Sequence, residues 1–546
     1  MKVRKIKTLW IPLLMVAAAL LGLLIGHICG RNSAMKKGMG LIEAASQQMN
    51  IMGQCGKMQD VLNMVNKFYV EDVDADSLQD VAIPLFLKQL DPHTIYVPRN
   101  EVQRVTGELK SNFGGVGITF TILHDTVRVQ SVVSGGPSSA LGVQGGDKII
   151  KVNGHDFTGP DLTNQMVMDS LRGEMGTKVQ ITVLRRGGKT IDFDITRGEI
   201  PLTSVLTSFQ IAKGVGYMKI DRFAEKTYEE MINGIAKLRS QGCRHLIVDL
   251  RGNTGGFLGV VSQMCNEFLD RNEMIVYTEG KHQKRQEMRA DGTGSCRDMG
   301  LTVLIDEASA SASEIFAGAM QDNDRGTVIG RRSFGKGLVQ NEMYLADGSI
   351  IRLTVARYHT PSGRCIQRPY DQGQEEYYED AINRYRNGEL VNADSIKTDT
   401  TQIFYTRCGR KVYGGGGIVP DVFVPYDTTS ASRYLIELRA QRIIYDWATN
   451  YVDAHRAELS QMSTEEFIRH LLKLQCLQEV RDFAKKQGVV CNGTLDSKEA
   501  KVIENEARAY IGNAADGYDV LYPVLLTQDD AVGKALEMLD VKPLYR

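Results

Sequence analysis

From about residue 200 onward the chain alternates short apolar runs with amphipathic stretches. The apolar runs are GVGYMKI, HLIVDL, LTVLID and GTVIG, and each has the length of a buried strand. The stretches TYEEMINGIAKLRSQG, GVVSQMCNEFLD and SEIFAGAMQD between them have helical spacing. This alternation predicts an α/β domain, and such a domain displays reactive groups where a strand ends and a helix begins.

One strand-to-helix junction of this domain carries three serines. The stretch DEASASASEIFAG holds Ser309, Ser311 and Ser313 between the strand LTVLID and the helix SEIFAGAMQD. Ser311 and Glu314 form an S-x-x-E capping box, which makes Ser311 the best N-cap candidate. A cap alone contributes about 1 kcal/mol. A nucleophile is the alternative, because the N–H of Ala312 can stabilise an oxyanion at the helix start.

A serine nucleophile needs a base, and RRSFGKGLVQ offers Lys336 between two glycines. Burial in an apolar site lowers a lysine pKa from about 10.4, and Gln340 can orient the amine without adding charge. The alternative for this stretch is a surface turn with a solvated lysine. No local motif supports a histidine base, although a Ser-His-Asp triad with His93, His245 or His359 stays open.

The turn after the strand HLIVDL reads DLRGNTGG. It is similar to the active-site loop of trypsin-like proteases, but Thr254 stands where their nucleophile would be, and the surrounding pattern is α/β. Gly255 and Gly256 fit a tight turn whose N–H is a second oxyanion donor. A plain strand-to-helix turn is the alternative.

The rest of the chain divides by pattern into further regions. Residues 35–105 have helical spacing, a glycine-punctuated β-rich module of about 90 residues follows, and the last hundred or so residues are again helical. The predicted organisation is a membrane anchor or signal (1–30), a helical region (31–105), a β-rich domain (106–198), an α/β core (199–428) and a helical C-terminal region (429–546).

The N-terminus predicts a location. MKVRKIK carries four cations, and the next stretch is apolar for about 20 residues, enough to cross a bilayer as one helix. A cleaved signal peptide is the alternative, but no convincing cleavage site follows. We expect a single-pass membrane protein with its catalytic part outside the cytoplasm, which is the periplasm in a Gram-negative cell.

Composition excludes several function classes. The 546 residues carry a formal net charge of −1, which gives no electrostatic case for nucleic-acid binding. The nine cysteines are scattered and none forms a C-x-x-C pair, so redox and metal motifs of that kind are absent.

These motifs, in this order, resemble the carboxyl-terminal processing peptidases, also called tail-specific proteases. LDPHTIYV is similar to the family's motif before its PDZ domain, and FGGVGITF, GGPSSALGVQGGDKIIKVNG and LRGEMGTKVQITVLR to that PDZ domain. LIVDLRGNTGG, SASASEIFAG and SFGKGLVQ are similar to its protease core. The resemblance covers about residues 58–425, whereas 369–412 and 430–546 extend beyond the minimal pattern.

The resemblance implies a Ser-Lys dyad in a core that shares its fold with ClpP and the crotonases. Ser311 is then the nucleophile, Lys336 the base and Gln340 its partner. The oxyanion donors are Ala312 and either Gly255 or Gly256. The PDZ loop that binds a peptide carboxylate comprises Gly114, Gly115, Val116, Gly117 and Ile118.

The predicted fold class is therefore multidomain α/β: a transmembrane helix, a helical region, a mostly β PDZ domain, a ClpP/crotonase-like protease core and a helical C-terminal region. The predicted function is a serine endopeptidase that recognises apolar protein C-termini and needs no metal or cofactor. A catalytically silent PDZ scaffold and a crotonase-type acyl-CoA enzyme are the alternatives. The C-terminal helices are expected to serve oligomerisation or substrate gating, with a homo-oligomer among the partners.

Overall fold

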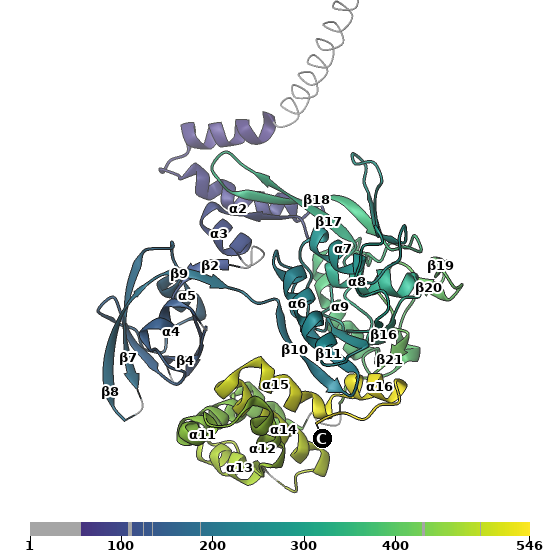
Figure 1. Cartoon of the computed structure of the whole chain (residues 1–546). Coiled ribbons are helices and arrows are strands. Elements are labelled where there is room, and N and C mark those ends of the chain that lie inside the picture. The colour runs from purple at the N-terminus through teal and green to yellow at the C-terminus, as the bar shows by residue number, and fades with distance from the viewer. Residues whose placement is uncertain are drawn as a thin grey trace, which may run out of the picture. The chain divides into compact units, whose positions relative to one another are not determined.

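The computed structural model of the chain describes residues 56–107, 112–123, 125–133, 135–185, 187–428, 432–491 and 493–545 (Figure 1). The chain divides into two units, one that ends at Phe86 and one that begins at Leu87. The described part of the first unit is helical over residues 56–68 and in α2 (Ala75–Leu87), which runs one residue past the division. Helix is the element type that the apolar spacing of this region predicts.

The first part of the second unit is a β-rich module. Its main sheet has the strand order β3-β4-β5-β7-β8, so β3 is an edge strand. Buried Val127, Val129, Ile149, Ile181 and Ile195 form its interior, because alternate residues of each strand point to the same face. The elements are α3 (Arg99–Gly107), β2 (Asn112–Gly115), β3 (Ile118–Leu123), β4 (Thr126–Val132), α4 (Pro137–Leu141), β5 (Lys148–Val152), β6 (His155–Asp156), α5 (Asn164–Leu171), β7 (Lys178–Arg185), β8 (Lys189–Thr196) and β9 (Gly198–Pro201).

The α/β core is a six-stranded sheet with the order β10-β11-β12-β15-β16-β21. Strands β11 to β21 are parallel, and β10 pairs antiparallel with β11. The strands are β10 (Val205–Ala212), β11 (Val215–Ile220), β12 (His245–Asp249), β15 (Gly300–Ile305), β16 (Thr327–Gly330) and β21 (Val422–Phe423). The predicted strand–helix alternation is thus present.

Helices cover both faces of this core sheet. On one face α6 (Thr227–Ser240), α7 (Leu258–Asn266) and α8 (Ala312–Asp322) share a buried apolar cluster with the strands (Figure 1). On the other face α16 (Asp530–Met538) packs Val532 and Leu536 against Tyr217 and Ile329. Every residue of α8 is buried, so this helix is held rigidly at its start.

A second, antiparallel sheet completes the core. Its order is β1-β18-β13-β14, and β17 pairs with β18. The elements of this part are β1 (Ile95–Val97), β13 (Met274–Glu279), β14 (Gln286–Arg289), β17 (Leu338–Tyr344), β18 (Ile350–His359), α9 (Gln374–Arg386), η1 (Ala393–Ser395), β19 (Ile403–Tyr405) and β20 (Lys411–Tyr413). Strand β1 follows the LDPHT stretch, so this sheet brings that stretch to the core.

The C-terminal region is helical, as its apolar spacing predicts. Its helices surround a separate buried cluster that includes Leu435, Trp447, Ile468, Val480 and Ile503. They are α10 (Arg433–Ala440), α11 (Ile443–Leu459), α12 (Thr464–Lys473), α13 (Leu477–Lys486), α14 (Ser497–Asp516) and α15 (Tyr518–Leu525). The last two helical elements, η2 (Leu526–Gln528) and α16, pack on the core sheet instead.

One component of the predicted fold class needs correction. The predicted transmembrane helix at residues 1–30 lies outside the described residues, and none of the described helices is both long and apolar enough to cross a membrane. The longest of them, α14, has 20 residues but carries charges such as Lys498, Glu504 and Arg508 along its length. The predicted fold class is therefore corrected for the described residues, which comprise the helical region, the β-rich module, the α/β core and the helical C-terminal region.

Candidate active site

Ser311 lies where the sequence predicts it, at the junction between β15 and α8. It is the N-cap of α8, with φ 56° and ψ −113°. This conformation is unfavourable for a residue with a side chain and costs about 1–3 kcal/mol, so the surrounding structure must hold it. A strained turn between strand and helix is also the way in which α/β hydrolases expose a nucleophilic serine.

The other two serines of the cluster have structural hydrogen bonds. The buried Ser309 hydroxyl donates to the carbonyl of Leu250 over 2.9 Å, and the buried Ser313 hydroxyl donates to the carbonyl of Asn253 over 2.8 Å. Both bonds tie the serine turn, residues 306–313, to the DLRGNTGG turn. Ser309 and Ser313 thus hold the two turns together.

Glu314 joins the serine turn to the lysine loop, which comprises residues 331–337 between β16 and β17. Its Oε2 accepts the main-chain N–H groups of Ser311 (2.9 Å) and Lys336 (2.8 Å), and its Oε1 accepts from the Gly335 N–H (2.7 Å) and the Ser333 hydroxyl (2.5 Å). Burial raises the pKa of Glu314, although these four donors favour its ionised form. The S-x-x-E motif identified Glu314 as the cap partner of Ser311, but gave no sign of its contacts with residues 333–336.

Tyr358 on β18 is a second link between the two segments. Its buried hydroxyl lies 3.1 Å from the carbonyl oxygen of Ser311 and also within hydrogen-bonding distance of the carbonyl oxygen of Lys336. Sequence analysis missed this residue, because nothing in RYHTPSG distinguishes it from an ordinary core tyrosine. Its side chain thus supports the main chain of both proposed dyad residues.

Lys336 has the electrostatic environment that a lysine base needs. Burial lowers its pKa, and the positive charge of Arg352 lowers it further. The negative charges of Glu314 and Asp91 act in the opposite direction but do not cancel these effects. A larger fraction of the side chain is therefore free amine near neutral pH than in a solvated lysine.

Gln340 lies on β17, directly across from Thr354 on β18. Its side-chain Nε2 donates to the hydroxyl of Thr354 over 3.3 Å. The predicted partner of Lys336 is thus anchored at its amide nitrogen, and its amide oxygen is the remaining polar end of the side chain.

The two glycines predicted as oxyanion donors differ in their surroundings. Gly255 has φ 107°, and a Cβ there would lie 2.7 Å from the Cβ of Ser311, so only glycine allows this approach. The N–H of Gly255 donates to Oδ1 of Asn253 over 2.8 Å. This engagement leaves Gly256, with φ 150°, as the candidate oxyanion donor of the two, alongside Ala312 in the first turn of α8.

Each of the three histidines considered from the sequence contacts a side chain other than Ser311. His93 Nε2 lies 2.7 Å from the hydroxyl of Tyr377, and His245 Nε2 lies 2.9 Å from the hydroxyl of Thr302. His359 stacks on Tyr277 with ring centroids 4.6 Å apart. Burial lowers the pKa of both His93 and His245 to about 4, so neither is protonated near neutral pH. These partners favour Lys336 over a histidine as the base.

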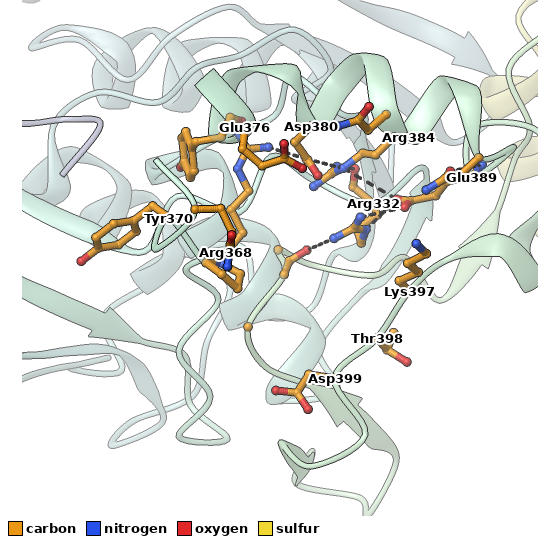
Figure 2. Close-up of a pocket in the computed structure, with 18 of the residues that line it drawn as sticks. Arg332, Arg368, Tyr370, Glu376, Asp380, Arg384, Glu389, Lys397, Thr398 and Asp399 are labelled. Atoms are coloured by element: carbon orange, nitrogen blue, oxygen red, sulfur yellow. Dashed lines mark hydrogen bonds and ion pairs between the residues drawn. The ribbon is translucent and has the colours of Figure 1, made fainter. Parts of the chain in front are cut away.

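The segment 369–412, which extends beyond the family pattern, braces the lysine loop. Arg384 on α9 donates to the carbonyls of Arg332, Ser333 and Phe334, over 3.2, 2.8 and 3.3 Å. Arg332 forms a buried two-bond ion pair with Glu389 (2.6 and 2.7 Å). Figure 2 shows these side chains converging on one wall of a cavity of about 820 Å³. No role for this segment follows from the sequence, because its contacts are with residues far away in the chain.

The predicted peptide-binding loop leads into the edge strand of the β-rich module. Gly114 and Gly115 belong to β2 and pair with β9, and Ile118 begins β3. The carbonyls of Val116 and Gly117 accept from Ser138 and Val133, over 3.0 and 2.9 Å. These bonds fix the loop directly before the edge strand, where an extended peptide can add to the sheet.

Comparisons with known proteins agree with this organisation. Family models match Peptidase family S41 over residues 214–373, a PDZ domain over 114–196 and a family of unknown function, DUF8443, over 434–515. The predicted domain limits stay predictions, as do the roles of the individual site residues.

Named relatives cover the PDZ and protease regions. The chain is 33% identical over 312 residues to a "Probable CtpA-like serine protease" of Staphylococcus saprophyticus, which is 57% of this chain and 62% of that protein. It therefore spans less than two thirds of that relative. A solved structure of the photosystem II D1 C-terminal processing protease matches with 25% identity and a TM-score of 0.35, over 67% of this chain and 92% of that one.

This chain covers a larger share of a further relative. The "Carboxy-terminal-processing protease" of Bartonella bacilliformis is 35% identical over 329 residues, which is 59% of this chain and 74% of that protein. Together with the match to the peptidase model, this relationship confirms the family predicted from the motifs: the chain belongs to peptidase family S41, with a PDZ domain before its protease core.

Proposed function

We propose that this chain is a serine endopeptidase that captures the apolar C-terminal tail of a protein in its PDZ domain and cleaves the protein near that end. The observation that carries the proposal is the shared carboxylate of Glu314, which accepts main-chain N–H groups from both Ser311 and Lys336. The lowered pKa of Lys336, caused first by burial, supports its use as a base.

In the proposed reaction the neutral amine of Lys336 takes the proton of the Ser311 hydroxyl while Oγ attacks the substrate carbonyl. The N–H groups of Ala312 and Gly256 stabilise the oxyanion, and Gln340 orients the lysine through its amide oxygen. Lys336 then gives the proton to the leaving amine. In the second half Lys336 takes a proton from the water that attacks the acyl-enzyme. It returns this proton to Oγ of Ser311 as the carboxylic acid product leaves.

Substrate capture is proposed to use the edge of β3. A peptide that pairs with β3 has its side chains alternately toward Ile118, Phe120 and Ile122, which pack on the apolar core of the module. Val167 and Leu171 of α5 belong to the same apolar cluster. An apolar tail is therefore expected to pair with this edge in preference to a charged one. The location outside the cytoplasm and the homo-oligomer stay predictions from the sequence.

The test is cleavage of a carrier protein that ends in an apolar tail, with the same carrier ending in two aspartates as the comparison. The full-length protein is expected to shorten the first carrier and leave the second intact, as read by mass spectrometry. Ser311→Ala and Lys336→Ala should abolish cleavage, and Lys281→Ala, at an exposed lysine, should not. Unchanged cleavage by Ser311→Ala would refute the proposal.

A further inference from the structure

The LDPHT turn before β1 lies against β18 of the protease core, and the proposed mechanism leaves it without a role. Asp91 and Thr94 of this turn are buried. The strand that follows it pairs with β18, with Ile95 opposite Arg352. This register places the turn beside Thr354, two residues further along β18.

A dense set of hydrogen bonds fixes the turn and its neighbour. Asp91 Oδ1 accepts from the main-chain N–H groups of His93 (2.8 Å) and Thr94 (2.9 Å), and Oδ2 accepts from the Thr94 hydroxyl (2.6 Å). The Thr94 hydroxyl oxygen accepts the Thr354 N–H over 3.1 Å. The Asp91 carboxylate is thus held in one orientation, and the main chain of Thr354 is tied to the same turn.

The hydroxyl of Thr354 connects this turn to Gln340. It donates to Asp91 Oδ1 over 3.1 Å and accepts from Gln340 Nε2 over 3.3 Å. An ionised carboxylate can only accept, so the single proton of the hydroxyl must point to Asp91. Only its lone pairs remain for Gln340, and Gln340 must therefore present its amide nitrogen to Thr354.

The orientation of the Gln340 amide bears on Lys336, the proposed base. With its nitrogen committed to Thr354, Gln340 keeps its amide oxygen for another donor, and a lysine amine is such a donor. If the amide were reversed, its free end would be the nitrogen, which cannot accept a hydrogen bond from a lysine amine. The direction of one hydroxyl proton therefore decides which end of Gln340 is available to the base.

We propose that Asp91 and Thr354 are positioning residues that act through Gln340, so that the LDPHT turn fixes the orientation of the amide that serves Lys336. The inference rests on the proposed function, in which Gln340 orients the lysine. It assigns to the turn before β1 a part in catalysis rather than only in packing the chain onto the core.

The test is a set of double-mutant cycles in the full-length protein, with cleavage of the apolar-tailed carrier as the readout. Thr354→Val removes the hydroxyl at nearly constant size, and Asp91→Asn allows the hydrogen-bond direction to reverse. Each should lower kcat about 10- to 100-fold with KM little changed, because the base is misoriented while substrate capture by the PDZ domain is untouched. Thr354→Ser keeps the hydroxyl and should restore most of the rate.

The decisive readout is non-additivity with Gln340→Ala. Because the proposed effect passes through Gln340, adding Thr354→Val or Asp91→Asn to Gln340→Ala should change kcat less than about twofold. Thr302→Val is the matched control, since it removes a buried threonine hydroxyl that contacts His245, and its effect should add to that of Gln340→Ala.

The outcomes distinguish a failure of the inference from a failure of the proposed function. If wild type cleaves, Ser311→Ala does not, and Thr354→Val and Asp91→Asn act at full rate or add independently to Gln340→Ala, the inference is overturned and the proposed function stands. If wild type does not cleave, or Ser311→Ala does, the proposed function fails and the inference falls with it. Should Thr354→Val fail to fold, the nearly isosteric Asp91→Asn and the Thr354→Ser variant decide the question.

Discussion

The main-chain N–H groups of Ser311 and Lys336 donate to one oxygen atom, Oε2 of Glu314, over 2.9 and 2.8 Å. The two nitrogens can thus be no further apart than these two bonds allow. The proposed nucleophile and base lie on different elements, yet a single buried carboxylate sets their main-chain positions relative to each other.

Replacing Glu314 should therefore disrupt both residues at once. Glu314→Gln puts an amide NH₂ where one oxygen now accepts two donors, so two buried donors lose their acceptor. We expect a loss of about 2–3 kcal/mol in the free energy of unfolding and a fall in kcat of about 100-fold. Denaturant melts and cleavage kinetics measure these effects. Glu307→Gln, which changes a half-buried carboxylate paired with Arg331 beside the serine turn, is the control, and an equal loss of kcat there would contradict the assignment.

The glycine turn should tolerate no side chain where it meets Ser311. An alanine at Gly255 would have its Cβ 2.7 Å from the Cβ of Ser311, and one at Gly256 would have it 2.1 Å from the carbonyl oxygen of Phe223. Each substitution should lower kcat about 100-fold or more by displacing the nucleophile or the oxyanion donor. Gly252 also has a positive φ of 73° but has open space around it, so Gly252→Ala should retain most of the activity. Activity close to wild type in Gly255→Ala would show that this approach is not needed.

The ion pair between Arg332 and Glu389 should contribute much of the stability of the lysine loop and its surroundings. Glu389→Gln leaves the buried guanidinium of Arg332 without its carboxylate, which typically costs about 3–5 kcal/mol. We expect a lower denaturation midpoint and faster hydrogen exchange at residues 332–336. The exposed pair of Arg433 and Glu437 provides the comparison, and Glu437→Gln should leave the midpoint nearly unchanged. Similar effects of the two substitutions would count against a bracing role for α9.

The pH dependence of cleavage should respond to Arg352. Its positive charge disfavours the ammonium form of Lys336 and, after burial, is the next cause of the lowered lysine pKa. Arg352→Gln removes that charge, so the lysine pKa should rise. Because the base acts as the neutral amine, the acidic limb of the kcat/KM profile should move to higher pH. Arg239→Gln, at a partly exposed pair with Asp298, should leave the profile in place. A shift of the limb to lower pH in Arg352→Gln would have the wrong sign for a lysine base.

The sequence was sufficient for the parts of the site that depend on local order. The capping-box offset separated Ser311 from Ser309 and Ser313, and the structure makes Ser311 the N-cap of α8. The alternation of strands and helices predicted the core sheet and the turn that carries the serines. These features follow from spacing along the chain, which hydrogen bonds within a turn or helix impose on the sequence.

The remaining parts depend on contacts between segments that are distant in the chain. Such contacts leave no periodic pattern in the sequence, because each needs the folded sheet to bring the two partners close. They join Glu314 to Lys336, Tyr358 to Ser311 and Asp91 to Thr354. The membrane helix predicted from the hydropathy of the N-terminal stretch lies outside the described residues, and none of the described helices is long and apolar enough to span a membrane.

The central claim is that Lys336 activates Ser311, and the most direct measurement is the rate at which a phosphonylating reagent labels the full-length protein. Intact mass and peptide mapping should show one adduct, on Ser311. Its rate should rise with pH through a midpoint below about 10.4, the ordinary pKa of lysine, and Lys336→Ala should slow it about 100-fold or more. Labelling of a different residue, or an unchanged rate in Lys336→Ala, would contradict the claim.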